Sequence, residues 1–302
     1  MDLFKKLYKL QNKRAYDLIA KAGLVVDKDS KIYYVDSVHG DDSYGGRTMS
    51  SPLATIAAAY AKCTSNNHDV IICLPRHDET FTGVLTIAKA GLSILGMKSG
   101  NLRPTLDISA AADIFSVEAA NVTISGFRFE AAKDAQTADI NIAGAFCKVS
   151  DCVHVGSTTS INKVNVYTIT AAGDDCLLED ITIYNTTVEV VGAILFEGAF
   201  TNGTFRNIVV LDSKGFTNGA IYDAAAATGV FLDHCFFQNA KAATAVVNMA
   251  NNSVGLMNDV GIAGRHTTIA SNMDPGTSFD LMNVKVCEEA IKTGMDYDVD
   301  AD

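Results

Sequence analysis

A short pattern recurs through most of this sequence, and it limits the possible folds more than any other feature. Each copy has an apolar residue, a free position, a residue common in turns, and then an apolar–free–apolar triplet, as in TISGFRF at 123–129 and FLDHCFF at 231–237. Subtraction of the residue numbers puts successive turn-type residues 24 to 30 positions apart: Gly96, Gly126, Asp151, Asp180, Asn207, His234, Asp259 and Asn283. Repetition at this interval is the signature of a solenoid or another repeat architecture.

The segments between these copies indicate strands and not helices. Most intervals hold a further short apolar stretch, such as ADINIAG at 138–144 and GAILFEG at 192–198. Long 3.6-residue periodicity and the fixed leucine spacing of a leucine-rich repeat are both missing. The pattern therefore predicts an all-β protein, a right-handed parallel β-helix, with aliphatic side chains stacked inside. Gly, Asn and Asp suit the turn position because they tolerate left-handed backbone conformations.

The stretch VHGDDSYGGRTMSSPLATIAAAYA, residues 38–61, predicts a cap for the open end of the coil. Ser51 is a suitable N-cap and Pro52 a suitable first helical residue. An apolar face would follow from Leu53, Ile56, Ala57 and Tyr60. The first strand of the coil is expected in DVIICLP at 69–75. The chain then divides into an N-terminal helical arm (1–28), a capping module (29–68), a parallel β-helix (69–290) and an acidic C-terminal tail (291–302).

The N-terminal arm has apolar residues at helical spacing and basic residues among them. The residues concerned are Leu3, Phe4, Lys5, Lys6, Leu7, Lys9, Leu10, Lys13 and Arg14. This pattern is typical of a basic amphipathic helix, neither a signal peptide nor a transmembrane span. Three interpretations stay open: the helix packs on its own domain, it docks on a partner or a neighbouring subunit, or it binds a membrane surface.

Composition excludes some functions. The net charge of −11 argues against nucleic acid as the main partner, because phosphate binding needs clustered Lys and Arg. The seven cysteines are scattered without a CxxC pair, so we expect buried free thiols and no disulfide framework. Cys and His spacings do not indicate zinc, and the DDSYGG loop lacks the ligand pattern of a calcium or nucleotide site. No metal or cofactor is expected.

The capping module also carries a family resemblance. Gly40, Asp41, Gly45, Pro52, Thr55, Ile56 and Pro75 match the opening of right-handed parallel β-helix proteins of the pectate-lyase-like superfamily. The match covers residues 33–80 by motif and about 81–290 by repeat pattern. It implies a fold, and it places none of that family's catalytic arginines or calcium-binding acids on this sequence.

Two functions are compatible with this resemblance. As an enzyme, the chain would resemble tailspike depolymerases and polysaccharide lyases, with Asp151 and Asp180 on successive coils as the catalytic pair. Carboxylates about 5 Å apart suit a retaining glycosidase. The simpler interpretation is that both are turn residues chosen for backbone geometry. Arg76, His77, Asp78 and Glu79 form another candidate acid–base group, and His154 and His234 are expected to be exposed or locally hydrogen-bonded. Tyr167, Tyr184 and Tyr222 are the aromatic candidates for a sugar groove.

As a structural protein, the chain resembles virion components of tailed bacteriophages, such as capsid decoration (cement) proteins or head fibres. This is the favoured expectation: a non-enzymatic homotrimer in the virion, assembled in the host cytoplasm and docked on the major capsid protein or another virion protein through the arm. Nucleic acid and membrane are not expected as partners, and glycan binding is left open. The polysaccharide depolymerase is the alternative.

Overall fold

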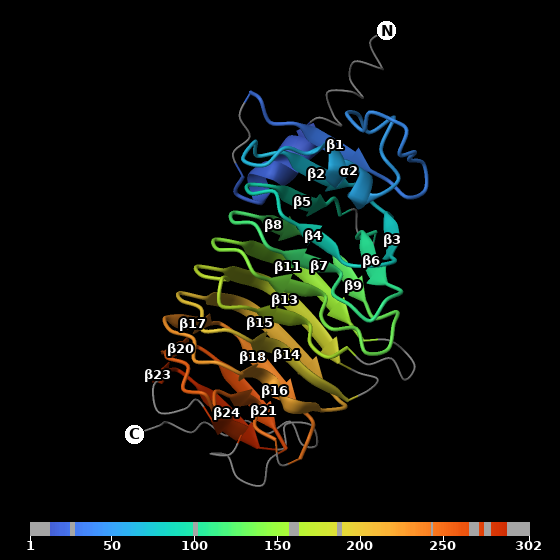
Figure 1. The fold of residues 1–302 in the computed structure, drawn as a ribbon. Helices are drawn as coiled ribbons and strands as arrows, with labels where there is room; N and C mark the ends of the chain where they lie inside the picture. The colour runs from blue at the N-terminus through green and yellow to red at the C-terminus, as the bar shows by residue number, and fades with distance from the viewer. Residues whose placement is uncertain are drawn as a thin grey trace.

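The computed structural model describes residues 13–24, 28–98, 102–156, 163–185, 189–242, 244–265, 272–274 and 279–288. Its strands pair in parallel throughout and stack as successive coils of a β-helix (Figure 1). Each complete coil crosses three faces, which we name face A, face B and face C in chain order. The prediction of an all-β parallel β-helix is confirmed.

Faces A and B belong to one sheet, and face C is a second sheet. Face A runs through β1 (Ile32–Val35), β2 (Val70–Cys73), β5 (Ser93–Gly96), β8 (Thr123–Ser125), the first halves of β11 (Lys148–Val155), β13 (Leu177–Asn185) and β15 (Thr204–Asp212), then β17 (Val230–Asp233), β20 (Gly255–Asn258) and β23 (Phe279–Met282). Face B contains β3 (Asp78–Phe81), β6 (Thr105–Ile108), β9 (Arg128–Glu130), the second halves of β11, β13 and β15, then β18 (Phe236–Asn239), β21 (Gly261–Gly264) and β24 (Lys285–Glu288). Face C contains β4 (Leu85–Ile87), β7 (Phe115–Val117), β10 (Ile140–Ile142), β12 (Tyr167–Ile169), β14 (Val190–Phe196), β16 (Phe216–Asp223), β19 (Val247–Asn248) and β22 (Met273–Asp274).

The repeated turn-type residue forms the corner between faces A and B. Seven of the eight predicted positions have a left-handed backbone: Gly126, Asp151, Asp180, Asn207, His234, Asp259 and Asn283. The six non-glycine residues among them have φ between 50° and 54°. A single left-handed residue bends the strand without breaking the pairing on either side. Gly96 is the exception, because β5 ends there and the next strand of the coil, β6, begins only at Thr105.

The interior is filled by stacked apolar side chains from all three faces. The register places Val149, Leu178 and Phe205 on three successive coils, and all three are fully or almost fully buried. Buried phenylalanines contact one another edge to face, as Phe115 and Phe129 do at 6.1 Å between ring centroids. Six of the seven cysteines are buried free thiols, as predicted, and Cys287 is partly exposed.

The capping helix forms, but it starts four residues later than predicted. Helix α2 (Ile56–Lys62) has Thr55 as its N-cap, whose hydroxyl accepts a hydrogen bond from the Ala58 amide. The predicted N-cap Ser51 fails because the chain from Leu53 onward is held in extended contacts: Leu53 exchanges backbone hydrogen bonds with β1 and its neighbour Asp36. The carboxylate of Asp42 then accepts bonds from the amides of residues 54 and 55.

Helix α2 still covers the N-terminal end of the coil. Figure 1 shows α2 beside β1 and β2 at the N-terminal end of the stack. The buried residues of α2, Ile56 and Ala59, pack with Leu53 against the interior of the first coils. Ala57 is exposed and Tyr60 is half-buried, so the apolar face is narrower than expected. The stack also begins earlier than predicted, because β1 pairs in parallel with β2 and forms the outermost strand of face A.

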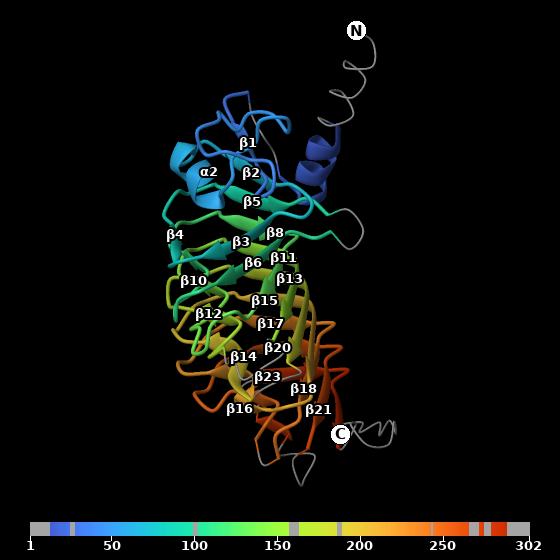
Figure 2. The ribbon, with the colours of Figure 1, turned by 90° about the vertical axis from the view of Figure 1, so that its right-hand side faces the viewer.

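The described part of the N-terminal segment is helical over residues 13–21 and packs on the chain's own face A. Ala15, Ile19 and Ala22 are buried against outward side chains of the first coils, among them Ile72 and Leu95. Figure 2 shows this helix beside β1, β2 and β5. Lys13 and Arg14 are exposed. The other residues of the predicted docking arm, and the acidic tail 291–302, lie outside the described residues.

Candidate active site: a groove between the N-terminal helix and the corner

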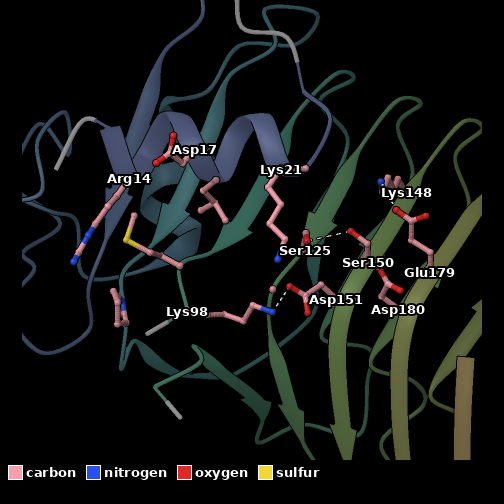
Figure 3. A pocket seen from close by; sticks show the side chains of 15 residues that line it. Arg14, Asp17, Lys21, Lys98, Ser125, Lys148, Ser150, Asp151, Glu179 and Asp180 are labelled. Atoms are coloured by element: carbon pink, nitrogen blue, oxygen red, sulfur yellow. Dashed lines mark hydrogen bonds and ion pairs between the residues drawn. The ribbon is translucent and has the colours of Figure 1, made fainter. Parts of the chain in front are cut away.

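A groove of about 550 Å³ lies between helix 13–21 and the first corners of the coil. The helix contributes Arg14, Asp17, Leu18 and Lys21 to one wall (Figure 3). The coil and its loops contribute the other wall: Pro75, Met97, Lys98, Ser125, Gly126, Lys148, Ser150, Asp151, Glu179 and Asp180. Both predicted catalytic carboxylates, Asp151 and Asp180, are therefore exposed to the same groove.

Asp151 is held by two cations, Lys98 and Arg103, which lie between β5 and β6 in the sequence. Lys98 forms an ion pair with Asp151 Oδ2, and the Arg103 guanidinium lies 3.3 Å from Oδ1. Arg103 also donates to the backbone carbonyls of Asp151 and Phe127. The side chain of Asp151 stays about a third exposed, so its carboxylate is positioned but still open to the groove.

Asp180 occupies the same position one coil further on. The pairs Ser150–Glu179 and Cys152–Ile181 set the register, so Asp151 and Asp180 lie side by side across a strand spacing of about 4.8 Å. Asp180 Oδ1 accepts a hydrogen bond of 3.0 Å from the side-chain amide of Asn207, on the following coil. Asp180 is exposed, and it is the less restrained carboxylate of the two.

The row of outward residues just before the corner completes the groove floor. Ser150 donates to Ser125 at 3.0 Å, and Glu179 is ion-paired with Lys148. None of these residues was a sequence candidate. Strand alternation, which puts the residue preceding each corner on the outer side of face A, is the signal that could have identified them.

The candidate group Arg76–Glu79 does not reach the groove and serves the cap. His77 is fully buried, with Nε2 3.0 Å from Glu79 Oε2 and Nδ1 accepting from the Ser37 amide. Glu79 also accepts a bond from the Ile56 amide at the start of α2. These bonds fix the corner of the first coil to the capping module, with the His77 side chain fully buried and that of Glu79 10% exposed.

His154 is buried, which corrects the expectation that it is exposed or bonded only locally. It follows the corner of β11 by three residues and points inward with Cys152, toward face C. Its Nδ1 lies 2.6 Å from Asp139 Oδ2, and its Nε2 lies 2.5 Å from the Tyr167 hydroxyl. Because a carboxylate only accepts, Nδ1 carries the proton and Nε2 accepts from Tyr167.

Lys163 completes this buried cluster. Its ammonium lies 2.6 Å from Asp139 Oδ2, and Gln136 donates to Oδ1 of the same carboxylate at 2.7 Å. Burial lowers the pKa of His154, and it raises the pKa of the Tyr167 hydroxyl well above its ordinary value. The charges balance within the cluster, because the Lys163 ammonium offsets the Asp139 carboxylate.

The three aromatic candidates for sugar stacking lie apart from one another, and none of them lines the groove. Tyr167 is fully buried in the cluster just described, and Tyr222 is buried with its hydroxyl 2.9 Å from Asn165 Oδ1. Tyr184 is 39% exposed, but it lies on face B and outside the groove. His234 is exposed, as expected, and its Nδ1 lies 2.7 Å from Asp233.

The described part of the chain offers neither a metal cluster nor a helix able to span a membrane. There, no three His, Cys, Asp or Glu side chains are grouped so as to hold a metal ion. None of the helices in the same residues has the length and apolar character needed to cross a bilayer.

Comparison with known proteins gives only distant structural likenesses. No family model and no curated protein sequence matches the chain. Among solved structures, a rhamnogalacturonan lyase is similar with 11% identity and a TM-score of 0.41, over 80% of this chain and 71% of the other. Pectate lyase Pel9A is similar with 13% identity and a TM-score of 0.48, over 87% and 80%. The GH136 lacto-N-biosidase from Eubacterium ramulus is similar with 9% identity and a TM-score of 0.33, over 83% and 67%. At these values the likenesses say nothing about the activity of this chain, and its parallel β-helix is established by its own strand register.

Proposed function

We propose that the protein binds a polysaccharide chain in the groove beside helix 13–21 and hydrolyses it with Asp151 and Asp180. The observation that carries the proposal is the placement of these two carboxylates side by side, on adjacent coils, in the wall of an open groove of about 550 Å³. A separation near one strand spacing matches the carboxylate distance of retaining glycosidases, about 5 to 5.5 Å.

The different surroundings of the two carboxylates assign their roles. Asp151, positioned by its ion pairs with Lys98 and Arg103, acts as the nucleophile on the anomeric carbon. Asp180 donates its proton to the glycosidic oxygen, and the aglycone leaves as an alcohol. In the second step Asp180 takes a proton from water, whose oxygen attacks the anomeric carbon and releases Asp151. Groove residues such as Lys21, Ser125 and Glu179 offer donors and acceptors for sugar hydroxyls.

The test is release of reducing ends from a panel of neutral and acidic bacterial polysaccharides by the full-length chain. We expect Asp151→Asn and Asp180→Asn each to lower the rate by at least about 100-fold. Asp259→Asn is the matched control, because Asp259 has the same left-handed corner conformation and is outside the groove. Absence of cleavage of every polysaccharide, or full activity of the Asp180→Asn protein, would contradict hydrolysis at this site.

A second candidate function is structural, as a component of a tailed-phage virion that attaches to the capsid protein through its N-terminal segment. The observation in its favour is that polar side chains at the corners, or one residue before them, form hydrogen bonds between successive coils. Asn207 donates to Asp180 at 3.0 Å, and Asn258 donates to Asp233 at 2.8 Å. Such ladders stabilise a solenoid whether or not it performs chemistry. The homotrimer expected from the phage resemblance remains part of this proposal.

Deletion of residues 1–12 tests the structural candidate without disturbing the packed helix. The deletion removes most of the basic amphipathic sequence and keeps Ala15 and Ile19, which cover Ile72 and Leu95. If the segment attaches the protein to capsids, the shortened chain stays folded and no longer co-sediments with particles of the phage that encodes it. Undiminished co-sedimentation would exclude attachment through this segment.

A further inference from the structure

The outer side of face B carries a largely apolar stripe. Strand alternation turns two residues of each coil outward here, and the register aligns them from coil to coil. The aligned outward residues on β11, β13, β15 and β18 are Val153, Val155, Thr182, Tyr184, Val209, Leu211, Phe236 and Gln238. Most are partly exposed, and Tyr184 is 39% exposed. We call this surface the face B stripe.

The same strands show a different outer surface on face A. There the aligned outward row reads Ser125, Ser150, Glu179, Arg206, Asp233 and Asn258, which are all polar. The second outward row of face A is mixed and reads Lys148, Leu177, Thr204, Phe231 and Leu256. Face B differs in that apolar residues occupy both of its outward rows, and a contiguous apolar surface of this kind marks an interaction site.

We propose that the face B stripe binds a second copy of this chain about a two-fold axis parallel to the axis of the coil. Such an axis places each coil against the same coil of the partner and reverses the order of residues along the strand. Outward residues that lie two positions apart on one strand therefore face each other across the interface. A two-fold contact uses the same patch on both subunits, so the patch must be complementary to itself.

Charge supports this pairing at the N-terminal edge of the stripe. The outward residues of β9 are Arg128 and Glu130, which pair with each other and have 40% and 43% exposed side chains. The axial two-fold places Arg128 opposite the partner's Glu130, and the reverse contact forms at the same time. A two-fold axis along the strands would instead pair β9 with β21, where the aligned positions are Gly261 and Ala263 and offer no counter-charge.

Size and area agree with the same arrangement. Tyr184, the largest protruding side chain, faces the partner's Thr182, and Leu211 faces the partner's Val209, so large groups meet smaller ones. Five strands at about 4.8 Å and some five residues at about 3.3 Å give roughly 400 Å² on each copy. The two copies together then bury about 800 Å², which is less than a stable complex usually buries, so we expect a weak dimer.

Sedimentation equilibrium of the full-length chain tests the contact. We expect a concentration-dependent shift from 32.1 kDa to twice that mass. We expect Tyr184→Glu to abolish the shift. Arg206→Glu is the matched control and should leave the shift unchanged, because Arg206 lies on the outer side of face A, in the first half of β15. A mass of 32.1 kDa at all concentrations up to the highest soluble one overturns the proposal, and so does a trimer.

A charge exchange tests the orientation of the axis. Arg128→Glu and Glu130→Arg each create like-charge contacts and weaken self-association about tenfold or more. Mixing the two variants restores dimers, because each acidic pair then meets a basic pair. The Arg128→Glu/Glu130→Arg double variant also dimerises. If the mixture associates no more tightly than either variant alone, the axial two-fold is wrong.

Discussion

Strand β11 takes part in two ion-paired clusters that lie three residues apart along the chain, and they differ sharply in how far they are buried. At the corner, Asp151 is held by Lys98 and Arg103 with about a third of its side chain exposed. Past the corner, His154 faces inward and joins Asp139 and Lys163, each 5% exposed or less. The charged groups of the first cluster contact solvent and line the groove. The second has exchanged water completely for protein partners.

The difference teaches where ionic chemistry in this fold is structural and where it is available. A buried carboxylate needs every bond it makes, because the alternative is an unpaired charge in a medium of low polarity. An exposed carboxylate can exchange a protein cation for water or for a substrate hydroxyl at little cost. The composition of the two clusters is nearly the same, so burial alone distinguishes them.

The largest effect expected from this comparison follows from removal of the buried cation. Lys163→Met leaves Asp139 with His154 and Gln136 but without its counter-charge, so we expect a loss of about 3 to 5 kcal/mol of unfolding free energy. Urea denaturation at pH 7.5 measures it. The Lys163→Met/Asp139→Leu double variant removes both charges and recovers much of the loss. A single variant within about 1 kcal/mol of the wild type would show that Asp139 is not buried as described.

Acid should lower the unfolding free energy through the buried cluster by less than the Lys163→Met substitution does, because each group keeps a hydrogen-bonding partner when His154 gains a proton. Burial lowers the pKa of His154 below its ordinary 6.5, despite the opposing effect of Asp139. The unfolded chain therefore takes up this proton at a higher pH than the folded one. The contribution of His154 is complete above pH 6.5 and decreases as the pH falls through 6.5 toward the lowered value.

Asp139 extends this loss to lower pH. Burial raises the pKa of Asp139, but the opposing effect of Lys163 and His154 is larger, so the pKa lies below its ordinary 3.8. The contribution of Asp139 to the unfolding free energy is therefore lost as the pH falls from 3.8 toward this lowered pKa.

The unfolding free energy measured from pH 8 to pH 4.5 should fall less steeply in a His154→Gln variant than in the wild type. His234→Gln, at an exposed histidine, should leave the slope as it is. Equal slopes in all three proteins would contradict a neutral buried His154.

The coil was predictable from the sequence because its cause is local. Each corner such as Asp180 or Asn207 needs a residue that tolerates φ near 50°, and each strand needs inward apolar residues at period two. The same alternation puts His154 inward with Cys152, and this signal was sufficient to predict its burial. The start of the capping helix was missed because Asp42, twelve residues before Ala54, decides it through hydrogen bonds.

The groove was only half predictable. The repeat register brings Asp151 and Asp180 together, and that much follows from their spacing. The second wall depends on contacts between distant segments: the helix around Ile19 lies on face A, and Arg103 reaches Asp151 across 48 residues. Periodicity contains no information on such pairs. The outer surface is likewise free of the constraints that maintain the coil, which is why it can differ between faces A and B.

The smallest effect should come from the exposed counterpart of Lys163. Lys98→Met removes one cation from Asp151, but Arg103 stays within 3.3 Å and water reaches the carboxylate. We therefore expect a loss below about 1 kcal/mol of unfolding free energy in urea denaturation at pH 7.5. If Asp151 is a nucleophile, the same change alters the rate of glycan cleavage far more than it alters stability, since the two properties depend on different states of the carboxylate. A loss comparable to that of Lys163→Met would mean that the corner carboxylate is as dependent on its partners as the buried one, and the groove would then be a structural joint like the cluster behind it.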